Sequence, residues 1–521
     1  MKSKIILFIF ATAFFTGCNE DLLETIPNDR LSSELFWKTD KDAVTASNAV
    51  YRYLENVNSF FGWDGMTDTG HANLLTTAQA ILEKGQADAT HVVFFNEWVD
   101  AYAGIRTANA FLANVDRITT KDQAMIDRLK GEVKALRAYL YIKLAALYGD
   151  VPLVTTEISL EESRNLTRTP VAQVWDFISK ELADAAEVLP KTQADKGRIT
   201  KGAALALKAR AMLYAGRYEE AANAARQVMD LNVYSLYGSY KNLFSYAAEN
   251  NQEVIIDKQF IKDTYNNNIF RLMAPYSQRN FGSFYVPTKK LVDSYQMANG
   301  KDISDPASGF DPQNPYKNRD PRLRYSIFVL GDTLPNGKIY NSVPGSGTAD
   351  AVDYSWFATQ TGFNVKKYIT REDLVQPENG GVNLILLRYA EVLLIYAEAK
   401  IEMNQPDQSV LDAINLVRNR VNMPSITGVF SQAELRDIVR RERLVELAFE
   451  GLRYFDIRRW AIAEAVMAGP VYGMTYSKTG TLTTISIPAS ERSFNKDRDY
   501  LWPIPQKERD LNPQLTQNPG W

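Results

Sequence analysis

Three short segments place aromatic side chains beside hydrogen-bonding ones. Trp63 and Asp64 lie between glycines, which suggests that this tryptophan is hard to bury fully. Tyr276 and Arg279 share a second segment, and Trp356 follows a loop rich in glycine and serine. The C–H faces of a sugar stack on aromatic rings, while its hydroxyls bond to carboxylate, amide and guanidinium groups. We therefore predict that these five residues form a shallow binding platform on loops; for each ring the alternative is packing in the core.

Side chains suited to catalysis are scarce in this sequence. His71 and His91 are the only histidines, so few histidines are available for a Ser-His-Asp triad or a histidine-rich metal site. The segment 331–338 imitates a phosphate-binding loop, but its gap is one residue too long, and Asn336-Gly337 favours a hairpin instead. No pair of carboxylates is marked out for glycoside hydrolysis. We predict that the protein is not an enzyme, uses no cofactor and has no metal at its binding site.

The composition is that of an ordinary globular protein, with 45% hydrophobic and 23% charged residues. The formal net charge of −3 gives no basic excess, which argues against nucleic acid as a partner. Cys18 is the only cysteine, so no disulfide can form within the chain and packing alone must stabilise it.

Arginines and carboxylates alternate through the segment 440–459, which could be taken for an anion site. At helical spacing the glutamates share one face, and we expect Arg453 and Arg458 to reach back to Glu446 and Glu450. Buried arginine–carboxylate pairs of this kind hold structures together. We therefore predict a structural role for this segment.

Helical periodicity dominates two stretches, at about 40–231 and 384–450. Within them, helices separated by short breaks form pairs that resemble tetratricopeptide repeats, in which each pair buries one face against the next. The predicted pairs are 122–148 with 170–189, the two halves of 200–231, and the two halves of 386–420. We predict a mainly α fold, a tetratricopeptide-like helical-repeat scaffold in which 200–231 packs against 386–420.

The stretch at about 235–380 differs, because it is rich in glycine, asparagine, proline and aromatic residues. Alternating segments at 253–257 and 324–330 predict short strands, and Asn336-Gly337 predicts a tight hairpin turn. We expect this part to be loop-rich and irregular with a few short strands. It holds too many aromatic residues to remain unpacked.

The first residues resemble a lipoprotein signal peptide, predicted at 1–17. Lys2 and Lys4 precede an apolar run that is too short to span a bilayer, and small residues lead directly to Cys18. Cleavage before Cys18 would leave this cysteine at the N-terminus for lipid attachment. Residues 18–31 form a polar tether in this interpretation.

Several segments together resemble the SusD/RagB family. The residues 512–521 carry two Asn-Pro steps and a final tryptophan, turn-fixing and burial-seeking types that predict a locked tail. With Tyr500–Gln506 they are similar to that family's ending, although the family usually ends in tyrosine where this chain has Trp521. The other matching segments are 282–300, 318–324, 387–398 and, most specific of all, 440–460.

The resemblance implies a single SusD-like domain at 32–521 and a role in nutrient capture. Members of the family are outer-membrane lipoproteins that bind glycans for a SusC-like TonB-dependent transporter. We accordingly expect lipid attachment at Cys18, a position facing the cell surface, and an oligosaccharide ligand. The alternative is a structural or peptide-binding helical-repeat lipoprotein of the cell envelope.

Overall fold

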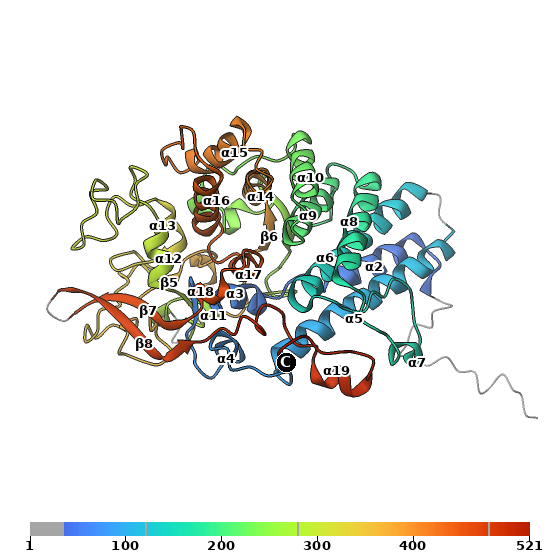
Figure 1. The fold of residues 1–521 in the computed structure, drawn as a ribbon, viewed down its shortest axis with the longest axis horizontal. Helices are drawn as coiled ribbons and strands as arrows, with labels where there is room; N and C mark the ends of the chain where they lie inside the picture. The colour runs from blue at the N-terminus through green and yellow to red at the C-terminus, as the bar shows by residue number, and fades with distance from the viewer. Residues whose placement is uncertain (1–35, 120–121, 279–280, 478–479) are drawn as a thin grey trace, which may run out of the picture.

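The computed structural model describes residues 36–119, 122–278, 281–477 and 480–521, and its fold is mainly helical as predicted (Figure 1). Long helices form one part of the molecule, and loops with short two-stranded ribbons form the other. Among the described residues, no helix combines the length and the apolar character needed to cross a membrane.

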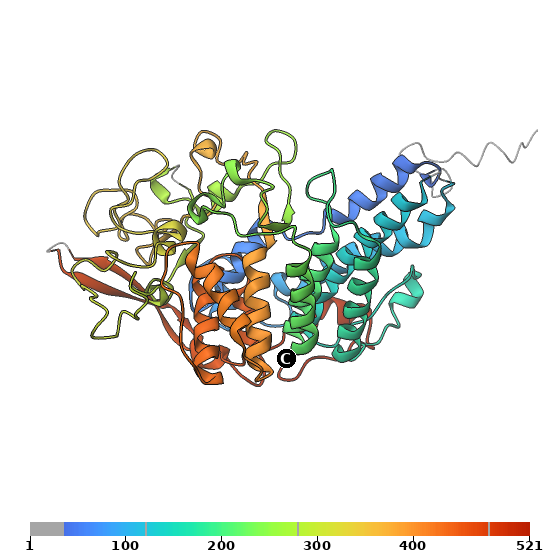
Figure 2. The same cartoon turned by 90° about the horizontal axis from the view of Figure 1, so that it is seen from above.

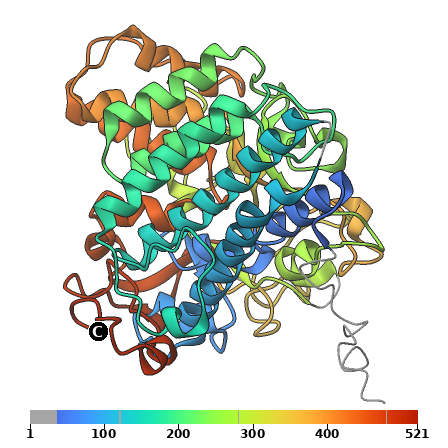
Figure 3. The same cartoon turned by 90° about the vertical axis from the view of Figure 1, so that its right-hand side faces the viewer.

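Three helical pairs form the centre of the scaffold, and all three were predicted from the sequence. They are α6 (Gln123–Tyr148) with α8 (Val171–Val188), α9 (Lys201–Tyr214) with α10 (Tyr218–Asp230), and α14 (Tyr389–Glu402) with α15 (Gln408–Asn419). The pairs stack in a row because α8 packs on α9 and α10 packs on α14 (Figures 1 and 3). The predicted contact between 200–231 and 386–420 is therefore confirmed.

Two further helices extend the row beyond α6, namely α2 (Asp40–Tyr51) and α5 (Val92–Asn114). At the other end, α16 (Gln432–Glu446) packs against α14. Figure 3 shows the stacked helices running side by side from α2 to α10. The longest gap in sequence along the row is the step from α10 to α14, which are separated by 158 residues (231–388).

The local sequence explains the α9–α10 pair. The Thr200 side chain accepts a hydrogen bond from the Ala203 N–H and so satisfies a free donor at the start of α9. Alanine lines much of α9 and α10, and small side chains let neighbouring helices approach closely. Gly216 ends the first helix with a φ of 70°, a conformation that glycine adopts without steric cost.

The loop-rich part lies between α10 and α14 and gathers at one end of the molecule (Figure 2). Its strands pair antiparallel, two at a time, with each other or with strands from outside this stretch. The pairs are β1 (Gly70–Ala72) with β3 (Tyr285–Pro287), β2 (Val254–Lys258) with β6 (Leu384–Arg388), and β4 (Ile327–Phe328) with β5 (Asn364–Val365).

The strand prediction at 253–257 is confirmed by β2, which pairs with β6 directly before α14. The turn at Asn336-Gly337 is also confirmed, since the Gly337 N–H donates to the Leu334 carbonyl at 2.8 Å. The strand prediction at 324–330 was partly wrong, because α13 (Arg322–Ser326) occupies its first half. Pro321 and the Asp320 carboxylate, which accepts from the Arg322 N–H, start a helical turn there.

The longest strands form a hairpin that the sequence analysis did not predict. Strand β7 (Gly469–Tyr476) pairs with β8 (Leu482–Arg492), and the hairpin projects from the loop-rich end (Figure 1). Apolar and polar residues alternate only weakly in both segments, so the signal from which a strand is predicted is faint here. The remaining short helices are α3 (Val57–Gly65), α4 (Ala78–Glu83), α7 (Leu160–Ser163), α11 (Ile269–Met273), α12 (Lys289–Ser294), α17 (Arg453–Arg459), α18 (Ala463–Val466) and α19 (Gln506–Leu511).

A buried ion-pair network joins the helical and loop-rich parts, and we call its centre the Glu446 network. Glu446 is fully buried and pairs with Arg388 at 2.6 Å, with Arg322 at 3.0 Å and with Arg420. Burial alone would raise the pKa of Glu446, but the three guanidinium groups lower it well below its usual range. Glu450 accepts in addition from Arg388 and Lys367.

The buried arginine–carboxylate pairs predicted for the segment 440–459 are present, but two predicted partners were wrong. Arg453 pairs with Asp68 at 2.7 Å rather than with the α16 glutamates. The guanidinium of Arg458 lies 3.5 Å from the ring centroid of Tyr454. The glutamates instead form ion pairs with arginines from β6, α13 and α15. These elements pack against α16 although they come from other parts of the sequence.

The tail at 512–521 is fixed to the scaffold as predicted. Asn518 is buried, and its side-chain amide donates to the carbonyls of Tyr148 and Trp502 at 2.8 and 2.7 Å. The Trp521 indole donates to the Leu501 carbonyl at 2.9 Å, and its ring packs edge-on against Phe94.

Candidate functional site

Five aromatic side chains from two loops come together at the loop-rich end, and we call them the aromatic platform. The members are Tyr276, Phe281, Tyr354, Trp356 and Phe357. Tyr276 stacks on Phe357 with 6.2 Å between ring centroids and 9° between the ring planes. Trp356 lies 4.3 Å from Phe357, and Tyr354 lies 6.2 Å from Tyr276.

The platform has a supporting layer and an open layer. Tyr276, Phe281 and Phe357 are half-buried, whereas Trp356 is 61% exposed and Tyr354 is 56% exposed. Burial of large aromatic rings stabilises a protein, so rings left this open on a supported layer are unusual. Exposed rings of this kind are available to stack on a ligand.

Both loops are fixed through one buried residue, Asn73, which follows β1. Its side-chain N–H₂ group donates to the Ala358 carbonyl at 2.9 Å, and its side-chain oxygen accepts from the Gln360 N–H at 2.8 Å. Its backbone N–H donates to the Phe284 carbonyl at 2.9 Å. Asn73 therefore holds the loop that carries Trp356 next to the loop that carries Phe281.

A second tie joins the loops at Asp350. The Asp350 carboxylate accepts from the Ser277 N–H at 2.9 Å, and burial raises the pKa of this carboxyl. Within the second loop, the Ser355 hydroxyl accepts from the Phe357 N–H at 3.2 Å. These bonds fix the backbone on both sides of the rings, so that the platform is preformed.

Charged groups lie at the margin of the platform. Asp353 is exposed, and its carboxylate accepts from the Gly345 N–H at 3.0 Å. The guanidinium of Arg271 lies 4.2 Å from the centroid of Phe281 and pairs with Glu378 at 2.8 Å. Aromatic faces bordered by a carboxylate and a guanidinium match the C–H faces and hydroxyls of a sugar.

Tyr276 and Trp356 thus lie together as the sequence analysis expected, but Trp63 and Asp64 do not. Trp63 is 2% exposed and packs against Tyr454, Phe455 and Trp502 with centroid distances of 5.2 to 5.5 Å. Asp64 is also buried and accepts from the Gly451 N–H at 2.5 Å. The prediction that these two residues belong to a surface platform was wrong.

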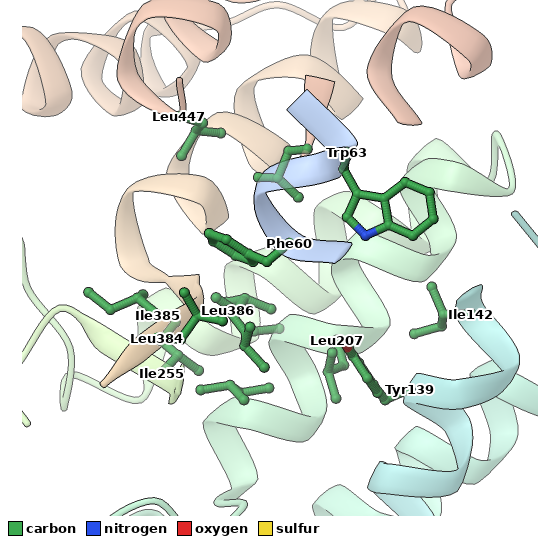
Figure 4. Close-up of a cluster of buried hydrophobic side chains, with 14 of the residues drawn as sticks. Phe60, Trp63, Tyr139, Ile142, Leu207, Ile255, Leu384, Ile385, Leu386 and Leu447 are labelled. Atoms are coloured by element: carbon green, nitrogen blue, oxygen red, sulfur yellow. The ribbon is translucent and has the colours of Figure 1, made fainter. Parts of the chain in front are cut away.

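The glycines beside Trp63 explain this error. A Cβ atom at Gly65 would lie 2.4 Å from the Tyr285 ring, and one at Gly62 would lie 3.3 Å from the Tyr285 hydroxyl. The glycines therefore let α3 approach β3 closely and enter the core. The sequence analysis had expected the same glycines to keep the tryptophan exposed. Figure 4 shows Trp63 and Phe60 projecting from α3 among side chains of the helices and of β6.

Two predicted residues, Arg279 and Cys18, lie outside the described residues. Phe281, Tyr354 and Phe357 were missed as individual residues, although the segments that contain them had been singled out by their mixture of aromatic and polar residues. Within the described ranges, no group of three or more histidine, cysteine, aspartate or glutamate residues is arranged to hold a metal ion.

Comparison with known proteins relates this arrangement to a family. The model of the SusD family matches residues 252–521, and a second model, described as starch-binding associating with outer membrane, matches residues 35–213. The chain is 27% identical to SusD-like protein P2 of Formosa agariphila, with 100% of both proteins covered.

Solved structures agree with the sequence comparison. A SusD-like carbohydrate binding protein from Bacteroides fragilis superposes with a TM-score of 0.84 at 29% identity, covering 92% of this chain and 100% of that one. A further SusD-like protein from the same species has a TM-score of 0.83 at 27% identity, covering 95% and 100%. Since the first family model spans more than half of the sequence, the chain belongs to the SusD family.

Proposed function

We propose that this protein is a cell-surface glycan-binding lipoprotein that captures oligosaccharides on the aromatic platform. The observation that carries the proposal is the pair of open rings, Tyr354 and Trp356, held on a supported layer of three further rings. Members of the SusD family bind carbohydrates and are not enzymes, in agreement with such a platform. The hydrogen-bonding groups of Asp353 and Arg271 would orient the sugar.

The proposal also includes the location and the partner. Residues 1–17 would be removed as a signal peptide, Cys18 would carry the lipid, and residues 18–31 would tether a single SusD-like domain at 32–521. The description of the second matching family model, associating with outer membrane, supports an outer-membrane position. The bound oligosaccharide would pass to a SusC-like TonB-dependent transporter.

Isothermal titration of the Tyr354→Ala/Trp356→Ala variant against a panel of oligosaccharides tests the platform. Laminarihexaose and maltohexaose are suitable first probes. We expect the wild type to bind a member of the panel and the double variant to lose that binding while keeping its melting temperature, because both rings are exposed. Tyr472→Ala is the matched control, since Tyr472 is 46% exposed but lies on the β7–β8 hairpin.

Native affinity in the double variant would place the ligand elsewhere. Lipid attachment is tested separately by Cys18→Ser, which should release the protein from the outer-membrane fraction in cells that lack the transporter. A variant that still sediments with the membrane would contradict the lipoprotein part of the proposal without affecting the platform.

A further inference from the structure

A cleft separate from the platform lies where the helical row meets the loop-rich part. It has a volume of about 580 Å³ and lies between the end of α2, the loop 195–198 and the segment that follows β2. The pocket lining includes Arg52, Lys196 and Tyr265, but none of the platform residues. Clefts at the junction of two structural parts are frequent ligand sites.

One wall of this cleft carries a supported aromatic ring with an open side. Tyr265 is 49% exposed, and it stacks on Phe260 with 5.5 Å between centroids and 11° between planes. Its backbone is fixed by two hydrogen bonds with Ile261, at 2.8 and 2.9 Å. Tyr265 therefore resembles the exposed rings of the platform, because in both places a supporting ring covers one face of an exposed ring.

The charges in the cleft are not balanced. Its lining holds four cations, Arg52, Lys196, Arg198 and Lys258, against two carboxylates, Asp195 and Asp257. Asp257 is buried, and Asp195 lies 3.4 Å from Arg198. Arg52 and Lys196 are exposed, and in the part of the chain that the structure describes neither has an ion-pair partner. The cleft thus offers an acidic ligand two exposed cations and an excess of positive charge.

A third cation, Lys258, holds the cleft together without being available to a ligand. Its ammonium group is buried and donates to the Leu54 carbonyl at 2.9 Å, beyond the last turn of α2. This bond ties β2 to the end of α2, so the wall that bears Arg52 is fixed relative to the wall that continues to Tyr265. The cleft is therefore preformed.

We propose that this cleft binds an acidic sugar residue, whose ring stacks on Tyr265 and whose carboxylate or sulfate group pairs with Arg52 and Lys196. The inference rests on the proposed glycan-binding function and adds to it a ligand class and a second binding site. Guanidinium and ammonium groups both bind carboxylate and sulfate oxygens through charge-assisted hydrogen bonds. The platform, by contrast, has an arginine that is already paired with Glu378.

Titration with hexagalacturonate and with a sulfated galactose hexasaccharide tests this site and distinguishes the two anions. We expect the wild type to bind one of them, and the affinity to fall by about tenfold in Tyr265→Ala and in Arg52→Gln/Lys196→Gln. Binding should weaken as salt is added, because exposed charges are screened. Lys41→Gln is the charge control, since Lys41 is exposed at the other end of α2, and Tyr472→Ala is the aromatic control.

The platform variant keeps this test separate from that of the proposed function. Tyr354→Ala/Trp356→Ala should retain binding of the acidic probe, whereas the cleft variants should retain binding of the neutral probe. Failure of the wild type to bind either acidic probe, or unchanged affinity in both cleft variants, would overturn the inference even if the platform binds laminarihexaose. Binding of the acidic probe alone, lost in the cleft variants, would support the cleft and contradict the platform.

Discussion

The Glu446 network and the aromatic platform are both clusters of chemically versatile side chains, but their surroundings differ. Glu446, Arg322 and Arg388 have almost no exposed surface, and each finds its partners within the protein. Tyr354 and Trp356 are more than half exposed, and among the described residues their ring contacts are with other members of the platform. Aromatic and charged side chains thus indicate a ligand site only where the fold leaves them exposed and without partners inside the protein. The network should therefore control stability, and the platform should control binding.

The largest expected effect is that of Glu446→Ala. It removes the carboxylate shared by three arginines and leaves their charges buried, which should lower the free energy of unfolding by about 3–5 kcal/mol. Chemical denaturation monitored by circular dichroism measures the loss. Glu187→Ala, at an exposed position of α8, should change stability little. A stable Glu446→Ala protein that fails to bind glycan would reverse the contrast between the two clusters.

Asp64 predicts how stability depends on pH. Burial raises the pKa of this carboxyl to about 7, against an unfolded value near 3.8. The folded state therefore holds its proton more tightly, and the protein loses up to about 4 kcal/mol of stability as the pH rises from about 4 to about 7. Asp64→Asn should be more stable than the wild type at pH 8 and equally stable at pH 4, as measured by denaturation at both values.

Asp68 supplies the control of opposite sign. Burial would raise its pKa, but Arg453 and Lys290 lower it to about 2. Its contribution to stability is therefore present above about pH 4 and is lost as the pH falls toward 2. Asp68→Asn should accordingly destabilise the protein at pH 8, where Asp64→Asn stabilises it. The same direction in both variants would show that burial dominates at both positions.

Asn518→Ala should have an intermediate effect on stability. The substitution removes the donor of the Trp502 carbonyl and the shorter of two side-chain hydrogen bonds to the Tyr148 carbonyl, at a cost of about 1–3 kcal/mol. Thermal unfolding measures it, and Gln514→Ala at an exposed position nearby is the control. Equal melting temperatures for the two variants would mean that water replaces the lost donor.

Trp356→Ala should have the smallest energetic effect, and it should appear only in binding. One stacked ring contributes on the order of 0.5–1.5 kcal/mol beyond area burial, by analogy with aromatic pairs. Because Trp356 is mostly exposed, unfolding should be unchanged within about 0.5 kcal/mol. Titration and thermal unfolding of the same preparation would separate the two quantities, and a large loss of stability would make Trp356 a structural residue.

The sequence predicted the helical pairs well, because periodic apolar residues and the breaks at Gly216 and 404–406 are local signals. It predicted burial of the α16 charges but not their partners, since Arg322 and Arg388 reach Glu446 through tertiary packing. The hairpin at 469–492 was not predicted, because its strands alternate apolar and polar residues only weakly.

The candidate site was predicted only in part, and the two tryptophans show why. Both Trp63 and Trp356 lie next to an aspartate or a serine and near glycines, so composition does not distinguish them. What buries Trp63 is its packing against Tyr454, Phe455 and Trp502, on a helix that Gly62 and Gly65 let approach Tyr285 closely. No local pattern carries that information, because Tyr285 lies more than 200 residues away in the sequence.

The Glu446 network also has a consequence for the order in which the chain folds. Glu446 is separated from Arg322 by 124 residues and from Arg388 by 58, so long loops must close before the ion pairs can form. Removing a lone carboxylate from water is costly until its partners arrive. In an intermediate with paired helices but an undocked loop-rich part, the charged groups of the Glu446 network would therefore remain hydrated. The last collapse should be slow and cooperative, with water leaving the centre only when all the charges meet.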